Sequence, residues 1–105
     1  MRRPEIVNLV KHTFHRVAPP GATAILYGSE ARGDAHEDSD IDVLVLLDKE
    51  KVTQNDRKQI AYPVYHIGYE TDTVISVMLY TKQAWETDMR ITPFYHNVMK
   101  EGIVL

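Results

Sequence analysis

The acidic segment at residues 28–42 constrains this chain more than any other feature. It reads GSEARGDAHEDSDID and lies between two short apolar runs. Six of its fifteen residues are Asp or Glu, and Arg32 is its only Lys or Arg. Carboxylates gathered so closely repel one another, and proteins tolerate such a cluster where water or a bound cation neutralises it. The segment therefore predicts either a solvated loop or a cation site between two strands.

The two apolar runs beside this segment are typical of strands. Residues 23–27 (TAILY) form a short run that stops at Gly28, and residues 41–47 (IDVLVLL) are apolar at every position except Asp42. An almost continuous apolar run is expected of a central strand that is covered on both faces. Between the runs, Gly28 and Ser29 predict a tight turn that leads into a short helix.

Two further helices and a third strand are predicted around these runs. Apolar residues recur at helical spacing from Pro4 to the break at residues 19–21 (PPG). Residues 49–68 are compatible with a helix, although Pro63 is expected to end or kink it. Residues 73–80 (TVISVMLY) are rich enough in β-branched and aromatic residues to predict a strand.

The C-terminal part carries two helix-start signals. Thr81 is expected to cap a turn that contains Trp85, and Thr92 with Pro93 is expected to open a last helix that Gly102 closes. The order of elements predicts an α/β (α+β) fold, a small mixed β-sheet with helices packed on one face. At 105 residues, the chain is expected to form a single domain over residues 1–105.

Composition narrows the possible partners and locations. The net charge of −3 gives no reason to expect a non-specific nucleic-acid coat, and it disfavours RNA without excluding it. The chain has no cysteine, so disulfides and thiolate chemistry are excluded. No window approaches the roughly 20 apolar residues of a membrane span, and no apolar stretch follows the first arginines. We therefore expect a cytoplasmic protein with no membrane partner.

The best candidate for a site is the pair Asp40 and Asp42. Residues two apart in a strand point to the same side, with their Cα atoms about 6.5–7 Å apart, so both carboxylates can share a hard cation. Asp42 interrupts a buried strand, where an ionised carboxylate needs a cation, a salt bridge or water. Gly28 and Ser29 add a turn that allows close approach of a phosphate. A solvated loop and an ordinary turn explain each motif alone, but their ordered combination favours a site that holds phosphate and Mg²⁺.

Residues 28–45 (GSEARGDAHEDSDIDVLV) resemble the signature of the DNA polymerase beta-like nucleotidyltransferase superfamily. The short chain, the continuation Ala31-Arg32-Gly33 and the tail TPFYHNVMKEGIVL look like the minimal nucleotidyltransferases, which are small bacterial and archaeal proteins. The resemblance implies that a nucleoside triphosphate binds with its phosphates at Gly28 and Ser29. It also implies two Mg²⁺ ions at Asp40 and Asp42. Arg32 would either position a phosphate or brace the turn.

The family pattern is incomplete at its third acid. In the family this carboxylate lies on the strand beside the Asp-x-Asp strand, where it helps to bind metal and to activate the acceptor hydroxyl. Here the strand at residues 73–80 contains no acid. Alternation places Ser76 at the expected position, and Asp72 at the start of the strand is the nearest acid and the candidate third catalytic residue. Because a serine carries no charge, we expect weak or absent transfer with binding retained.

Two functions from different classes follow. The first is Mg²⁺-dependent transfer of a nucleoside monophosphate from a nucleoside triphosphate to an acceptor hydroxyl. The alternative is a catalytically impaired binding or regulatory subunit, the antitoxin-like half of a two-protein module. An unrelated acidic cation-binding domain is a third and weaker interpretation.

A protein partner or a second copy of the chain is expected to contact one of two surfaces. These are the first helix, at the face carrying Ile6, Leu9 and Val10, and the apolar C-terminal end. Tyr62, Tyr65 and Tyr69 follow near-helical spacing and are interpreted as packing residues rather than as a surface for stacking a base.

Overall fold

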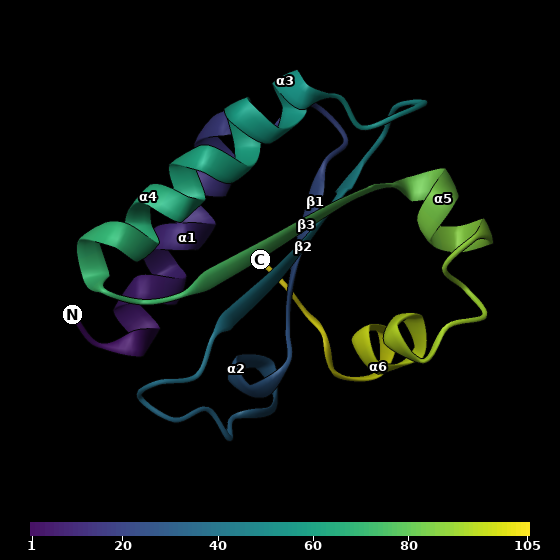
Figure 1. Cartoon of the computed structure of the whole chain (residues 1–105). Helices are drawn as coiled ribbons and strands as arrows, with labels where there is room; N and C mark the ends of the chain where they lie inside the picture. Colours follow the sequence, from purple (N-terminus) through teal and green to yellow (C-terminus); the bar gives the residue numbers. More distant parts are fainter.

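A four-stranded sheet forms the centre of the protein (Figure 1). The order of its strands is β3 (Ile75–Thr81), β2 (Ile41–Leu47), β1 (Thr23–Tyr27) and β4 (Ile103–Val104). Strand β1 is antiparallel to β2 and to β4, whereas β3 is parallel to β2. The computed structural model describes all residues from 1 to 105. This mixed sheet confirms the predicted fold class.

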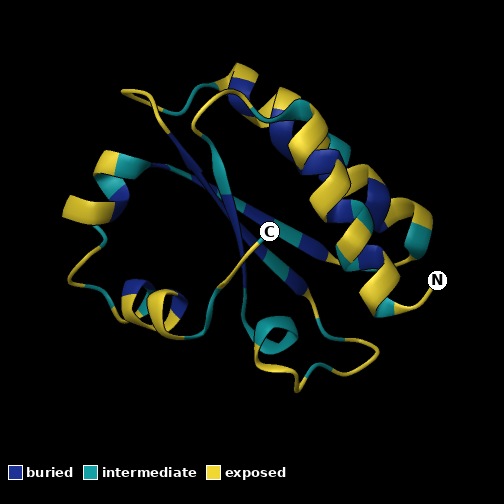
Figure 2. Cartoon of the chain, turned by 180° about the vertical axis from the view of Figure 1, so that it is seen from behind, coloured by how far each residue is buried: buried dark blue, intermediate teal, exposed yellow.

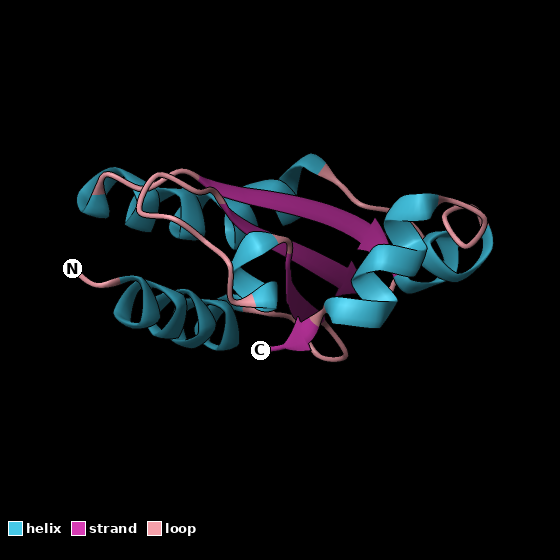
Figure 3. Ribbon diagram, turned by 90° about the horizontal axis from the view of Figure 1, so that it is seen from below, coloured by secondary structure: helices cyan, strands magenta, loops and turns pink.

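Helices cover both faces of the sheet rather than one. Helices α1 (Arg3–Val17) and α4 (Tyr62–Thr71) pack on one face, and α5 (Lys82–Thr87) and α6 (Pro93–Glu101) lie on the other side of the strands (Figures 1 and 3). The reason lies in β2, which is apolar on both faces. Leu44 and Leu46 point away from α1 and α4 and pack in a cluster with Trp85, Tyr95 and Val98. Figure 2 shows the resulting band of buried residues along the strands.

The long helical segment before β3 continues through Pro63, so the proline does not end the helix, which was one of the two predicted outcomes. Helix α3 (Gln54–Asp56), a π-helical turn (Arg57–Ala61) and α4 follow one another directly. In the π turn, the Tyr62 N–H donates to the Arg57 carbonyl, five residues back. Pro63 has no N–H to donate, and the widened turn before it accommodates the proline ring that would otherwise crowd the preceding turn. The helix thus accommodates Pro63 by changing locally from α-helical to π-helical geometry.

Most of the other elements lie at the residues predicted from the sequence. The first two strands match their predicted residues, and the side chains of Thr81 and Thr92 accept the capping N–H bonds at the starts of α5 and α6. Strand β3 begins at Ile75 rather than at residue 73, because Asp72 ends α4 in a left-handed conformation, with φ 53°. The short strand β4 was not predicted.

Two surface interpretations need correction. The side chains of Tyr62, Tyr65 and Tyr69 are not packed in the core, since the residues are 51%, 37% and 87% exposed. Conversely, Ile6 and Val10 are buried against the sheet and are not available to a partner. Ile103 and Val104 at the C-terminal end are exposed.

None of the helices combines the length and the apolar character that crossing a membrane requires.

Candidate active site

The turn after β1 presses directly against Asp42. Gly28 has φ 74° and ψ −155°, a conformation that residues with a Cβ atom rarely adopt, and it is followed by the four-residue helix α2 (Ser29–Arg32). A Cβ atom built on Gly28 would lie 2.5 Å from Oδ2 of Asp42. The glycine is therefore required both by its backbone conformation and by the neighbouring carboxylate. Gly28 thereby brings the start of α2 beside Asp42. The first N–H groups of this helix have no partner within the helix.

Asp42 lies at the centre of a row of three side chains across the sheet. The register pairs Asp42 with Tyr27 of β1 and with Ser76 of β3. Side chains at paired positions share a face of the sheet, so all three point to the face that α5 and α6 partly cover. On that face the Tyr27 hydroxyl donates a hydrogen bond to the Met78 sulfur, with 3.4 Å between the oxygen and the sulfur. The Tyr27 ring packs edge-on against the Phe94 ring, with 5.3 Å between the ring centroids. Ser76 thus occupies the position beside Asp42 where a third carboxylate was expected.

The electrostatics of the site favour a cation. Burial raises the pKa of the Asp42 carboxyl and the charge of Asp40 raises it further, while Arg32 acts in the opposite direction. No hydrogen bond from another protein group contributes to this shift, so the half-buried carboxylate oxygens face solvent and the neighbouring charges rather than a protein donor. Burial and the charge of Asp42 also raise the pKa of Tyr27 to about 12. The tyrosine is therefore protonated at neutral pH and cannot act as a base there.

Asp42→Asn is expected to stabilise the metal-free protein, increasingly so as the pH rises. The pKa of Asp42 is raised in the folded state, so the wild-type stability is highest below the ordinary carboxyl value and is lost as the pH rises through the raised value. Asparagine has the same shape and does not titrate. Urea unfolding in a chelator at several pH values measures the difference, with Asp38→Asn as the control that removes an exposed carboxylate from the same loop. A difference that does not vary with pH would contradict this account of Asp42.

Arg32 forms ion pairs with two acidic side chains. Its Nε donates to Asp34 at 3.3 Å and its Nη1 donates to Glu101 at 3.1 Å. These contacts tie α2 to the end of α6. These contacts are of the kind expected of a residue that braces the turn, and a role in positioning a phosphate stays a prediction.

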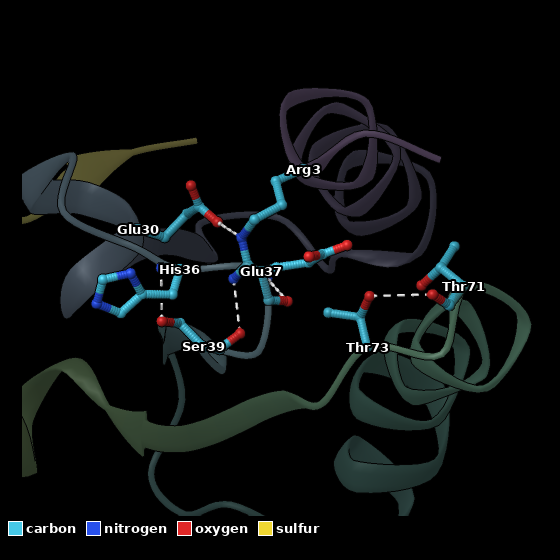
Figure 4. A network of polar contacts seen from close by, with 7 residues as sticks. All are labelled: Arg3, Glu30, His36, Glu37, Ser39, Thr71 and Thr73. Atoms are coloured by element: carbon cyan, nitrogen blue, oxygen red, sulfur yellow. Dashed lines mark hydrogen bonds and ion pairs between the residues drawn. The ribbon is translucent and has the colours of Figure 1, made fainter.

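The loop between α2 and β2 is held by Arg3, a residue that the sequence analysis did not select. Arg3 donates through Nε to Glu30 at 2.7 Å and through its two terminal nitrogens to the backbone carbonyls of Glu37 at 3.1 Å and Ser39 at 2.7 Å (Figure 4). The only hint in the sequence is its position in the first turn of a helix, where the helix dipole disfavours a cation. The Glu30 carboxylate offsets that unfavourable interaction.

Asp72 is not brought beside Asp42. It is the exposed C-cap of α4, three residues before the first residue of β3, so strand alternation does not extend to it as the sequence analysis assumed. Instead it lines an open groove of about 460 Å³ with Tyr65 and Tyr69. The chain contains no group of three or more His, Cys, Asp or Glu side chains that could hold a metal ion. The structure thus brings together Gly28, Ser29 and Asp42, with Asp40 close enough to act on Asp42.

Known proteins share both this sequence pattern and this fold. Residues 6–104 match the family model described as "Nucleotidyltransferase domain". Over 78 residues the chain is 36% identical to the "Putative protein adenylyltransferase" of Methanocaldococcus jannaschii, which covers 74% of this chain and 71% of that protein.

Solved structures of toxin–antitoxin proteins have a similar fold. One contains AMP-PNP and has a TM-score of 0.61 at 18% identity, covering 92% of this chain and 69% of that one. A mutant of the MntA-HpeT toxin–antitoxin has a TM-score of 0.54 at 18% identity, covering 100% of this chain and 72% of that one. At this level of identity the likeness concerns the fold.

Proposed function

This chain belongs to the nucleotidyltransferase domain family, and we propose that it transfers a nucleoside monophosphate from a nucleoside triphosphate to an acceptor hydroxyl, with Mg²⁺ and with release of pyrophosphate. The observation that carries the proposal is the half-buried Asp42 carboxylate, which lies directly against the Gly28 turn and feels the like charge of Asp40. A carboxylate in this state is poised to bind a cation, and the adjoining turn places that cation beside the phosphates.

The residues present fit an oxygen-liganded cation. Asp40 and Asp42 would hold Mg²⁺, and Gly28 and Ser29 would hold phosphate oxygens through their backbone. When bound, Mg²⁺ supplies positive charge that stabilises the attacking and leaving oxygens. The acceptor oxygen forms a bond to the α-phosphorus, and the bond from that phosphorus to the oxygen bridging to the β-phosphorus breaks, so that pyrophosphate leaves with that oxygen. The proton of the acceptor hydroxyl passes to water. Ser76 and the protonated Tyr27 cannot take this proton as a carboxylate would, which supports slow transfer.

The acceptor and the nucleotide are proposed from the relatives. The curated relative is described as a "Putative protein adenylyltransferase", which supports ATP as the donor and a protein side-chain hydroxyl as the acceptor. A similar fold with AMP-PNP also supports an adenine nucleotide. The net charge of −3 disfavours RNA as the acceptor.

Ser76 supports a second candidate function. Since it stands beside Asp42 where the family resemblance implies a carboxylate, the chain could bind nucleotide without transferring it. It would then act as the regulatory, antitoxin-like half of a two-protein module, in keeping with toxin–antitoxin proteins among the similar structures. The partner would be a second protein rather than a membrane.

The two candidates are separated by incubating the protein with ATP labelled at the α-phosphate and with a cell extract as the source of acceptors. Labelling of a protein that requires Mg²⁺ and is lost in Asp42→Asn supports the transferase. Triphosphate binding without labelling, together with a partner recovered from cells, supports the regulatory subunit. Absence of triphosphate binding contradicts both and leaves an acidic cation-binding domain.

A further inference from the structure

We propose that Arg3 is a positioning residue, which fixes the backbone on the N-terminal side of Asp40 so that Asp40 and Asp42 can act on the same cation. This inference rests on the proposed function, because it assigns a purpose to contacts around the proposed metal ligands. Arg3 itself touches neither carboxylate. Its effect is transmitted through Ser39, the residue that immediately precedes Asp40 (Figure 4).

Arg3 joins three segments that are distant in the sequence. From the first turn of α1 its guanidinium reaches Glu30 in α2 and two carbonyls of the acidic loop, those of Glu37 and Ser39. The ion pair with Glu30 is well shielded, with side-chain exposures of 17% and 16%. A planar guanidinium can serve three acceptors at fixed angles, whereas a lysine ammonium would not reproduce that fork. The arrangement is therefore specific to arginine.

The contacts on either side of Asp40 explain why the anchor matters. On one side, the Ser39 carbonyl accepts from Arg3 at 2.7 Å, and on the other the Ile41 N–H donates to the Val74 carbonyl of the segment before β3 at 2.9 Å. Asp40 is thus held between two pinned backbone groups. The hydrogen bonds between His36 and Ser39 are internal to the loop and do not attach it to the core.

The rigidity of this anchor comes from the core. Helix α1 buries Ile6 and Val10 against the sheet, one and two turns beyond Arg3, so the guanidinium extends from a fixed helix end. The exposed side chain of Asp40 has no such packing of its own. Without Arg3, the loop would be free to carry Asp40 away from Asp42, and the like charges of the two carboxylates would favour that separation.

The test compares Mn²⁺ affinity and local hydrogen exchange in the full chain. Arg3→Ala is expected to weaken Mn²⁺ binding by about 10- to 100-fold, the range found when groups that orient metal ligands are removed. It should also increase amide exchange at residues 38–41. Arg2→Ala removes the same charge from the adjacent exposed position and is expected to change neither measurement. Arg3→Lys should restore only part of the affinity.

A further variant separates positioning from simple structural support. Glu30→Gln removes the charge of the ion pair but leaves an acceptor for Arg3 and both loop carbonyl bonds, so Mn²⁺ affinity should stay close to wild type. Equal Mn²⁺ affinity and exchange in Arg3→Ala and wild type would overturn the inference while leaving the proposed function intact. Equal losses in Glu30→Gln and Arg3→Ala would overturn it as well, by showing that only the ion pair matters. If the wild-type protein binds no Mn²⁺, the proposed function itself is contradicted, and the inference about Arg3 fails with it.

Discussion

Gly28→Val is expected to abolish binding of a nucleoside triphosphate. Its Cβ atom would lie 2.5 Å from Oδ2 of Asp42, so the carboxylate and the turn must move apart. The backbone at φ 74° and ψ −155° is also essentially restricted to glycine, which adds a strain of about 1–3 kcal/mol. Calorimetric titration with a non-hydrolysable triphosphate and Mg²⁺ measures the loss, and circular dichroism checks that the fold is retained.

Gly33→Val supplies the matched control. Gly33 also has a positive φ, 83°, but a Cβ atom there would meet nothing within 4 Å. Gly33 is in the left-handed helical region, with ψ 11°, so valine there also adds backbone strain but meets no collision, and the variant should lose stability and keep triphosphate binding. Normal binding by Gly28→Val would show that the turn has only a structural role.

Ser76→Asp is expected to produce the largest gain. The register places this side chain beside Asp42 on the same face. The new carboxylate would therefore give the cation a further oxygen ligand besides those of Asp40 and Asp42. We expect Mn²⁺ to bind at least about tenfold more tightly, equivalent to about 1.4 kcal/mol, and metal-dependent transfer to increase. Without metal, the additional like charge should destabilise the protein. Titration calorimetry and labelled-nucleotide transfer measure the two effects.

Two further variants test which residue takes the position of the third acid. Ser76→Asn has nearly the same volume as Ser76→Asp but no charge, and it should give no gain. Asp72→Ala should leave both affinity and transfer unchanged, because Asp72 caps α4 rather than facing Asp42 from β3. Robust wild-type transfer that disappears in Asp72→Ala would identify Asp72 as the catalytic acid and contradict this placement.

Local sequence signals accounted for most of the fold. The apolar runs of β1 and β2, the glycine turn between them and the threonine caps of α5 and α6 are governed by neighbouring residues, and all five features lie as expected. Alternation within β3 predicted the face of Ser76, and the family resemblance predicted its place beside Asp42; the register agrees with both.

The features that the sequence did not predict depend on contacts between distant residues. Arg3 reaches partners 27 to 36 residues away, which no periodic pattern reveals. The π turn before Pro63 is a local exception: it is a change of helix type that hydrophobic periodicity cannot distinguish from the end of a helix. The exposure of Tyr69 and the second helical layer depend on which face each element turns to the sheet.

The central claim is that Asp42, together with Asp40, binds a divalent cation beside the Gly28 turn. Calorimetric titration of Mn²⁺ into the wild type and Asp42→Asn tests it most directly, since the substitution keeps the side-chain shape and removes one charge. The account predicts measurable binding by the wild type, and a loss of at least about tenfold, or about 1.4 kcal/mol, in the variant. Equal affinities in the two proteins would contradict it.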